Sequence, residues 1–205
     1  MSDTAFWNKI AQKYAASPIE DVPAYEASLK RVFARLSPND HVLELGCGTG
    51  STALRLSEYA AKITATDFSS EMIRIAKSKQ SDTQFTNVDF QVVDAQSPSD
   101  GHTYDVVCAF NLVHLLPDFD AGMQHIKSQI KPGGLFISKT PCLGEMSRFM
   151  PVVIWLMQRV GKAPFVSNFT ITQLEAKLRD AGFELIESET YGKAGRSRFI
   201  VARPL

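Results

Sequence analysis

Three glycines at alternate positions follow an apolar segment in HVLELGCGTG, residues 41–50. Gly46, Gly48 and Gly50 lie where this segment ends, and Glu44 lies within it. Glycine adopts backbone torsions that other residues avoid, and it lets a ligand approach the main chain closely. A helix that begins at such a turn presents free N–H groups and a partial positive charge. The spacing therefore predicts a ligand-binding turn with a carboxylate beside it.

The glycine spacing and the acid together distinguish two classes of ligand. A dinucleotide site places a pyrophosphate on the helix N-terminus and favours G-x-G-x-x-G. This turn has G-x-G-x-G, with Ser51 where the third glycine of that pattern would fall. Glu44 would repel a pyrophosphate, but it would attract a ligand with a positive centre. S-adenosylmethionine is such a ligand, because it carries a sulfonium and an ammonium group and no phosphate.

Acidic residues that follow the next two apolar segments fit an adenosine. Asp67 could accept hydrogen bonds from both ribose hydroxyls, a role that serves NAD and S-adenosylmethionine alike. Asp94-Ala95 ends the third segment and could contact the adenine edge. Met72 lies one turn into the following helix, where it could pack on the adenine face or belong to the core.

The elements that position these residues alternate between strands and helices. Such alternation favours a parallel sheet covered by helices on both sides. The turn at 192–195 makes the last two strands a hairpin, so only the last strand is antiparallel. The fold predicted is a three-layer α/β sandwich with a mainly parallel seven-stranded sheet. The pattern predicts strands over 41–45, 62–66, 88–93, 104–110, 135–139, 183–191 and 196–202, helices over 4–15, 23–36, 49–59, 69–79, 119–130 and 170–181, and a turn over 131–134.

Five motifs occur in order: VLELGCGTG, TATDFSSEMIRIAKSK, VVDA, YDVVCAFNLVHLL and KPGGLF. Together they closely resemble the motifs of class I S-adenosylmethionine-dependent methyltransferases, whose fold is Rossmann-like. The sequence is most similar to the small-molecule branch related to the ubiquinone/menaquinone-biosynthesis enzymes. The resemblance covers residues 5–140 well and the final hairpin loosely. It implies S-adenosylmethionine as cofactor.

The resemblance also implies a role for particular positions of this sequence. The glycine loop would bind the methionine moiety, Asp67 the ribose hydroxyls, and Asn111 would lie near the transferring methyl group. The N-terminal helices, residues 1–38, would form a lid in which Tyr14 and Trp7 contact the cofactor or pack on the sheet edge. Glu44 would serve the cofactor or only bind the N–H groups of the loop. The cofactor residues implied are Tyr14, Glu44, Gly46, Cys47, Gly48, Gly50, Asp67, Phe68, Met72, Asp94, Ala95 and Asn111.

A sulfonium is already an activated electrophile, so the mechanism requires alignment of the acceptor rather than a metal ion or a protein nucleophile. His114, just past the fourth strand, is the candidate general base at its ordinary pKa, or else a histidine that packs and hydrogen-bonds. Lys139 follows the fifth strand and is a candidate substrate contact because of that position.

Residues 141–168 match none of these motifs and are rich in methionine and aromatic residues. They are interpreted as a lid or pocket for a partly hydrophobic small molecule, as a dimer face, or as a peripheral contact with a membrane surface. A helix that only completes the core is the remaining alternative. The candidate substrate residues in this insertion are Met146, Phe149, Trp155 and Met157.

Composition limits the function further. The formal net charge is +0, so the basic excess of a nucleic-acid-binding protein is missing. The 3 cysteines include no CxxC pair, which disfavours a disulfide framework or a metal site and favours a reducing cytoplasm. The N-terminus lacks the pattern of a signal peptide, and no apolar run is long enough to cross a bilayer. We expect a single domain over 1–205, cytoplasmic, as a monomer or homodimer.

Two other functions remain open at this stage. One is an NAD-type, dinucleotide-dependent oxidoreductase on the related doubly wound fold, which Glu44 and the glycine spacing disfavour. The other is a protein that binds S-adenosylmethionine without catalysis, which no residue of the sequence excludes.

Overall fold

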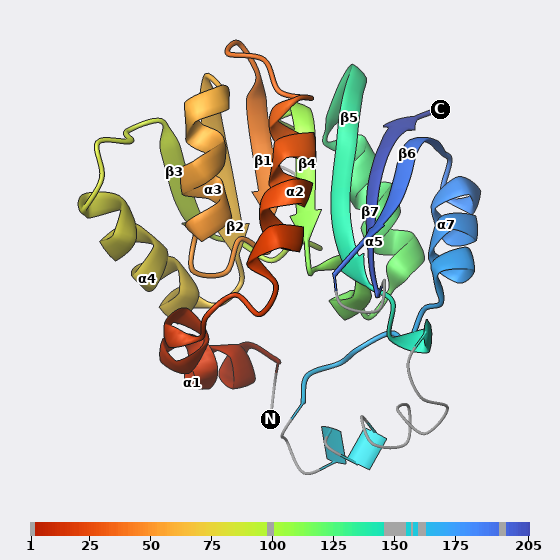
Figure 1. Ribbon diagram of the computed structural model, residues 1–205, viewed down its shortest axis with the longest axis horizontal. Helices are drawn as coiled ribbons and strands as arrows, with labels where there is room; N and C mark the ends of the chain where they lie inside the picture. The colour runs from red at the N-terminus through yellow and green to blue at the C-terminus, as the bar shows by residue number, and fades with distance from the viewer. Residues whose placement is uncertain (1–2, 98–100, 146–154, 157, 160–162, 193–195) are drawn as a thin grey trace.

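The computed structural model describes residues 3–97, 101–145, 155–156, 158–159, 163–192 and 196–205 (Figure 1). Its centre is a 7-stranded sheet in the order β3-β2-β1-β4-β5-β7-β6. The strands are β1 (His41–Leu45), β2 (Lys62–Asp67), β3 (Val88–Val92), β4 (Tyr104–Phe110), β5 (Ile130–Pro141), β6 (Phe183–Tyr191) and β7 (Ser197–Pro204). β7 is antiparallel to both of its neighbours, whereas β1 to β5 are parallel. The predicted sheet, with only its last strand reversed, is confirmed.

Helices cover both faces of this sheet, and α2 and α3 lie in front of it in Figure 1 while α5 lies behind. The helices are α1 (Asp3–Ala16), α2 (Val22–Phe33), α3 (Ser51–Leu56), α4 (Ser70–Ser81), α5 (Phe119–Ser128) and α7 (Ile171–Asp180). Short 3-10 helices are η1 (Ser57–Tyr59), η2 (Val113–Leu115) and η3 (Leu143–Glu145). No helix among the described residues has both the length and the apolar character that crossing a bilayer demands.

Side-chain alternation along the strands divides the core into two layers. In β1, Leu43 packs into the layer beneath α5 and α7, while Val42 packs into the layer beneath α2, α3 and α4. In β5, Phe136 packs into the first of these layers and Ile137 into the second. Because both faces are buried, the central strands consist of nearly continuous apolar residues.

Local capping determines where several helices begin. Asp21 accepts a hydrogen bond from Ala24 N at the start of α2, 3.0 Å, with Pro23 in the first turn. Ser69 does the same for Met72 N at the start of α4, 3.2 Å. These caps place the N-termini of the helices near the carboxyl ends of the strands, which point downward in Figure 1 toward α1.

β5 begins five residues earlier than the sequence predicts, and α5 ends earlier. Ile130 pairs with Tyr104, and the register then shifts so that Leu135 pairs with Val106. The intervening residues 131–134 form an irregularity inside the strand, with Gly133 at φ 81. The prediction of a free turn here is wrong, because a Pro-Gly-Gly sequence marks a turn and a strand bulge equally well.

Candidate active site

The loop between β1 and α3 holds all three predicted glycines in the left-handed region, with φ 64 at Gly46, 55 at Gly48 and 75 at Gly50. A Cβ atom at Gly46 would lie 2.8 Å from Leu112 Cδ1, so this position has no room for a side chain. At Gly48 a Cβ atom would meet only the ring of Tyr14, at 3.8 Å. The backbone at Gly48 is therefore open to a ligand that enters beneath Tyr14.

Asp67, the last residue of β2, fixes the shape of this loop. Its Oδ2 accepts a hydrogen bond from Gly48 N, 2.9 Å, and its Oδ1 accepts one from Ser69 N, 2.9 Å. Burial raises the pKa of this carboxyl group. The alternative in which Glu44 binds the N–H groups of the loop is wrong, because the carboxylate of Asp67 accepts the hydrogen bond from the loop instead.

Glu44 is buried beneath the loop with 2 % of its surface exposed. Within the described part of the chain, its Oε2 has no hydrogen-bond partner. Burial, and then the negative charge of Asp67, raise the pKa of Glu44 to about 8. A buried acid without a partner fits a ligand that brings a positive charge.

A cavity of about 170 Å³ runs along the ends of β2 and β3. It contains the predicted adenosine contacts Asp67, Phe68, Asp94 and Ala95. The backbone turn at Asp94 is held by its own Oδ1, which accepts from Gln96 N at 2.9 Å. The structure thus brings these residues together in one concave surface.

A second cavity, of about 340 Å³, continues from the first and has Gly46, Asp67 and Phe68 in common with it. It adds Gly48, Tyr14, Met72, Asn111 and His114 as lining residues. Met72 is also 2 % exposed and packs with core residues of α1 and α4. Met72 is therefore a core residue that also lines the cavity, and its contact with adenine stays a prediction.

Asn111, directly after β4, is the one non-glycine residue with positive φ in the described chain, at 55°. Its N–H donates to Lys139 O across the ends of β4 and β5, 2.8 Å. Backbone in this sparsely populated region is typical of functional sites. The strained turn presents the Asn111 side chain to the cavities beside the glycine loop.

His114 lies on η2 and lines the second cavity, but its environment differs from the prediction. Burial lowers the pKa of His114 to about 4, because an apolar site disfavours the charged imidazolium. Its Nδ1 has no partner within the described residues. The expectation of a base at its ordinary pKa is wrong, and His114 is neutral at pH 7.

A third cavity, of about 500 Å³, has Tyr14 and Asn111 in common with the second. Lys139 lines it at the end of β5, and Lys79 lines it from α4. Lys79 Nζ donates to Thr49 Oγ1 and to Ser51 Oγ, each at 2.8 Å. Sequence reasoning missed Lys79 as a site residue, since its approach to the glycine loop depends on how α4 packs against α3.

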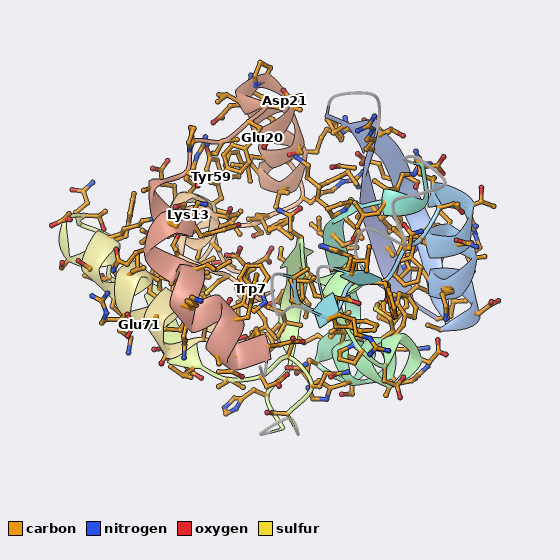
Figure 2. All side chains as sticks on the ribbon, turned by 90° about the horizontal axis from the view of Figure 1, so that it is seen from below. Trp7, Lys13, Glu20, Asp21, Tyr59 and Glu71 are labelled. Atoms are coloured by element: carbon orange, nitrogen blue, oxygen red, sulfur yellow. The ribbon has the colours of Figure 1, made fainter. Side chains whose placement is uncertain are left out.

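Helix α1 covers the cavities from below, and Figure 2 shows Trp7 on the side of α1 that faces the middle of the molecule. Trp7 lines the first and second cavities, and Tyr14 lines the second and third. The two rings meet edge to face, with centroids 6.1 Å apart.

Of the predicted substrate residues in the insertion, only Trp155 is among the described residues. Trp155 is 51 % exposed and lines none of the three, and the Arg159 guanidinium lies 4.8 Å from the centroid of its ring. Met146, Phe149 and Met157 lie outside the described residues. Pro164, Phe165 and Val166, at the end of the insertion, do line the first or second cavity.

A family model described as a methyltransferase domain matches residues 19–188. The chain belongs to this methyltransferase family. With its mixed seven-stranded sheet and glycine loop, it is a class I S-adenosylmethionine-dependent methyltransferase, as the motifs predicted. The match runs from the start of α2 to within β6 and so includes every strand that contributes to the site.

Named relatives agree with this assignment. The methyltransferase is 30% identical over 166 residues to a ubiquinone biosynthesis O-methyltransferase of Xanthomonas axonopodis pv. citri, covering 77% of this chain and 68% of the relative. It is 34% identical over 123 residues to the highly reducing polyketide synthase PKS2 of Leptosphaeria maculans, covering 53% of this chain but only 5% of that much longer protein. The chain thus spans a small part of the length of that synthase.

The fold is also that of solved structures. The complex of DhpI with SAH superposes with a TM-score of 0.78 at 23% identity, covering 98% of this chain and 94% of that one. At this level of identity the likeness concerns the fold.

Proposed function

We propose that this methyltransferase transfers the methyl group of S-adenosylmethionine to a small, partly hydrophobic acceptor held in the 500 Å³ cavity. The observation that carries the proposal is that this cavity and the 340 Å³ cavity share Tyr14 and Asn111. A cofactor on one side of these residues and an acceptor on the other would meet between them.

The residues of the first two cavities fit the cofactor. The carboxylate of Asp67 suits the ribose hydroxyls, and the buried acid of Glu44 suits the cationic end, since a nearby positive charge favours its ionised form. Asp94 and Ala95 suit the adenine edge. The remaining proposed contacts in these two cavities are Tyr14, Gly46, Gly48, Phe68, Met72 and Asn111. Cys47 lines the 500 Å³ cavity instead and Gly50 lines none of the three, so their contact with the cofactor is proposed from the loop alone.

The mechanism then depends on orientation. When bound, the cofactor supplies a methyl group on an electrophilic sulfonium. The chain's own contribution is to hold the acceptor atom in line and to exclude water, and such alignment is worth about 7–11 kcal/mol of the barrier. Tyr14 and Trp7 on α1 line the cavities, which supports the lid role proposed for residues 1–38.

The acceptor atom is proposed to be a hydroxyl oxygen, supported by the O-methyltransferase relative. A hydroxyl must lose its proton during transfer, and a neutral imidazole is the form that accepts a proton. His114 lines the 340 Å³ cavity and not the 500 Å³ one, so it is the candidate base for an acceptor hydroxyl that extends past Asn111 toward the cofactor. With a pKa of about 4 it is a weak base, so its contribution depends on a position close to the acceptor.

For residues 141–168, the pocket, dimer-face and membrane-surface proposals all stand. The exposed Trp155 and Leu156, at 51% and 53%, favour a contact outside the cavities for their own part of the segment. A cytoplasmic location and a monomer or homodimer also remain proposals, and the buried, free thiols of Cys47, Cys108 and Cys142 support a reducing compartment.

Calorimetry with S-adenosylhomocysteine and with NAD tests the cofactor, and transfer of labelled methyl groups to a panel of phenols and alcohols tests the activity. We expect tight binding of S-adenosylhomocysteine, none of NAD, and transfer to a hydroxyl. Binding of NAD alone would favour an oxidoreductase. Tight cofactor binding without transfer to any acceptor would favour a binding protein.

A further inference from the structure

Lys139 lies beside the point where the two large cavities meet. Its carbonyl oxygen accepts from Asn111 N at 2.8 Å, so the two backbones are adjacent at the ends of β4 and β5. Asn111 lines both cavities, whereas Lys139 lines only the 500 Å³ one. Its side chain therefore belongs to the wall of the proposed acceptor site.

The ammonium group of Lys139 is held by neutral partners. Nζ donates to Ser28 Oγ at 3.1 Å, and it lies 5.9 Å from the centroid of the Tyr191 ring. The Ser28 hydroxyl uses its own proton on Tyr25 O, 2.8 Å, so it acts toward Lys139 as an acceptor. An ammonium has three N–H donors, which leaves two for a ligand.

The charge of Lys139 has no counter-ion within the described residues, where it forms no ion pair. Asp21 is near enough to raise the pKa of Lys139, but this acid caps α2, and removal from water lowers that pKa by more. Glu20, the other acid of the cavity, is exposed in the α1–α2 connection, where Figure 2 labels both acids. A partly desolvated cation without a paired anion costs free energy unless a ligand supplies that anion.

We propose that Lys139 binds an anionic group of the acceptor, a carboxylate or a phosphoryl group, in the 500 Å³ cavity. This inference rests on the proposed function and specifies its substrate class as hydroxy acids or their phosphoryl equivalents. The anion would be held at the end of β5, and the rest of the molecule would extend past Asn111 toward the methyl group.

Matched pairs of anionic and uncharged probes test whether Lys139 binds an anion. In the presence of saturating S-adenosylhomocysteine, ligand-observed NMR titrations compare 3,4-dihydroxybenzoate and 3-hydroxypropyl phosphate with uncharged partners, 3,4-dihydroxybenzamide and 1,3-propanediol. We expect at least one anion to bind 10-fold or more tightly than its neutral partner. This preference should disappear in Lys139→Met, be partly retained in Lys139→Arg, and persist in Lys62→Met, which removes an exposed lysine at the start of β2.

The cofactor itself has a carboxylate, so a second experiment tests whether Lys139 binds the cofactor's carboxylate or the anionic group of the acceptor. Calorimetry of wild type and Lys139→Met compares S-adenosylhomocysteine with 5′-methylthioadenosine, which has no amino acid moiety. Unchanged affinity for both ligands supports an acceptor anion. A 10-fold loss for S-adenosylhomocysteine alone assigns Lys139 to the cofactor and overturns the inference, as does equal binding of anions and neutral partners. Failure of the wild type to bind S-adenosylhomocysteine would instead contradict the proposed function.

Discussion

The carboxylate of Asp67 accepts a hydrogen bond from the backbone amide of Gly48, 2.9 Å, and so joins the end of β2 to the loop that follows β1. The same side chain accepts from Ser69 N, one residue before α4 begins. Asp67 thereby positions two neighbouring loops, the one after β1 and the one between β2 and α4. It also lines both cavities assigned to the cofactor, so the loop's shape and the ligand's affinity depend on the same group.

Asp67→Asn should weaken binding of S-adenosylhomocysteine by roughly 10- to 100-fold, since hydrogen bonds to a charged group are worth about 1.5–3 kcal/mol. The amide still offers one acceptor, so the fold should persist. Calorimetry measures the affinity and circular dichroism the fold. Asp89→Asn, an exposed acid on β3, is the matched control and should bind like the wild type. Equal affinities in the two variants would contradict the ribose assignment.

Glu44 should make the ligand-free protein less stable at alkaline pH. Its folded-state pKa, about 8, lies above the ordinary value of 4.5, so the folded state binds more protons between these values. The free energy of unfolding should therefore fall as pH rises from 5 to 8. Urea denaturation of Glu44→Gln should show a weaker dependence and greater stability at pH 8, by roughly 1–4 kcal/mol. A parallel pH dependence in both proteins would show that Glu44 is not responsible.

Cofactor binding at pH 7 should release a proton from Glu44. Most of this carboxyl group is protonated in the free protein, and a cationic ligand nearby favours the ionised form. Calorimetry in phosphate and in Tris buffers measures the release through their different ionisation enthalpies. S-adenosylmethionine should release more protons than S-adenosylhomocysteine, which has no sulfonium charge. The difference between the ligands should vanish in Glu44→Gln; its persistence there would place the titrating group elsewhere.

The pH–rate profile should show no inflection from His114 near pH 6.5. Its pKa is lowered to about 4, so the base form is present throughout pH 5–8. If His114 takes the acceptor's proton, His114→Asn should lower kcat by roughly 10²- to 10⁴-fold at saturating cofactor. Because His114 lines the 340 Å³ cavity assigned to the cofactor, affinity for S-adenosylhomocysteine is measured in the same variant. His125→Asn, on α5, is the control and should behave like the wild type. An unchanged kcat in His114→Asn would leave His114 a packing residue.

Most of the sheet follows from local patterns, and the exceptions have a physical cause. β1 is bounded as predicted, since an apolar run meets a glycine turn at Leu45. The start of β5 at Ile130 was missed because its pairing with Tyr104 is a long-range contact that no local residue reports. Similarly, α2 ends at Phe33 because its cap forms at Ala34, although apolar periodicity continues to Leu36.

The candidate site likewise contains residues that local patterns predict and properties that only the packed structure reveals. Gly48, Asp67 and Asp94 were predicted from their positions at strand ends, and the structure places them around one set of cavities. The low pKa of His114 and the high pKa of Glu44 were not predictable, because burial depends on side chains from distant elements. Lys79 ends the motif TATDFSSEMIRIAKSK, but the motif indicates no role for it, and only the packed structure brings it to Thr49.

Helix α1 supplies Trp7 and Tyr14 to the cavities, yet among its described residues only Ala11 is fully buried. A helix with so small a buried area can separate from the body at a low free-energy cost, well below that of global unfolding. If the proposed lid encloses the cofactor, release of S-adenosylhomocysteine would require that separation. The turnover rate would then be limited by the rate at which α1 detaches, and amide hydrogen exchange along α1 would measure that rate.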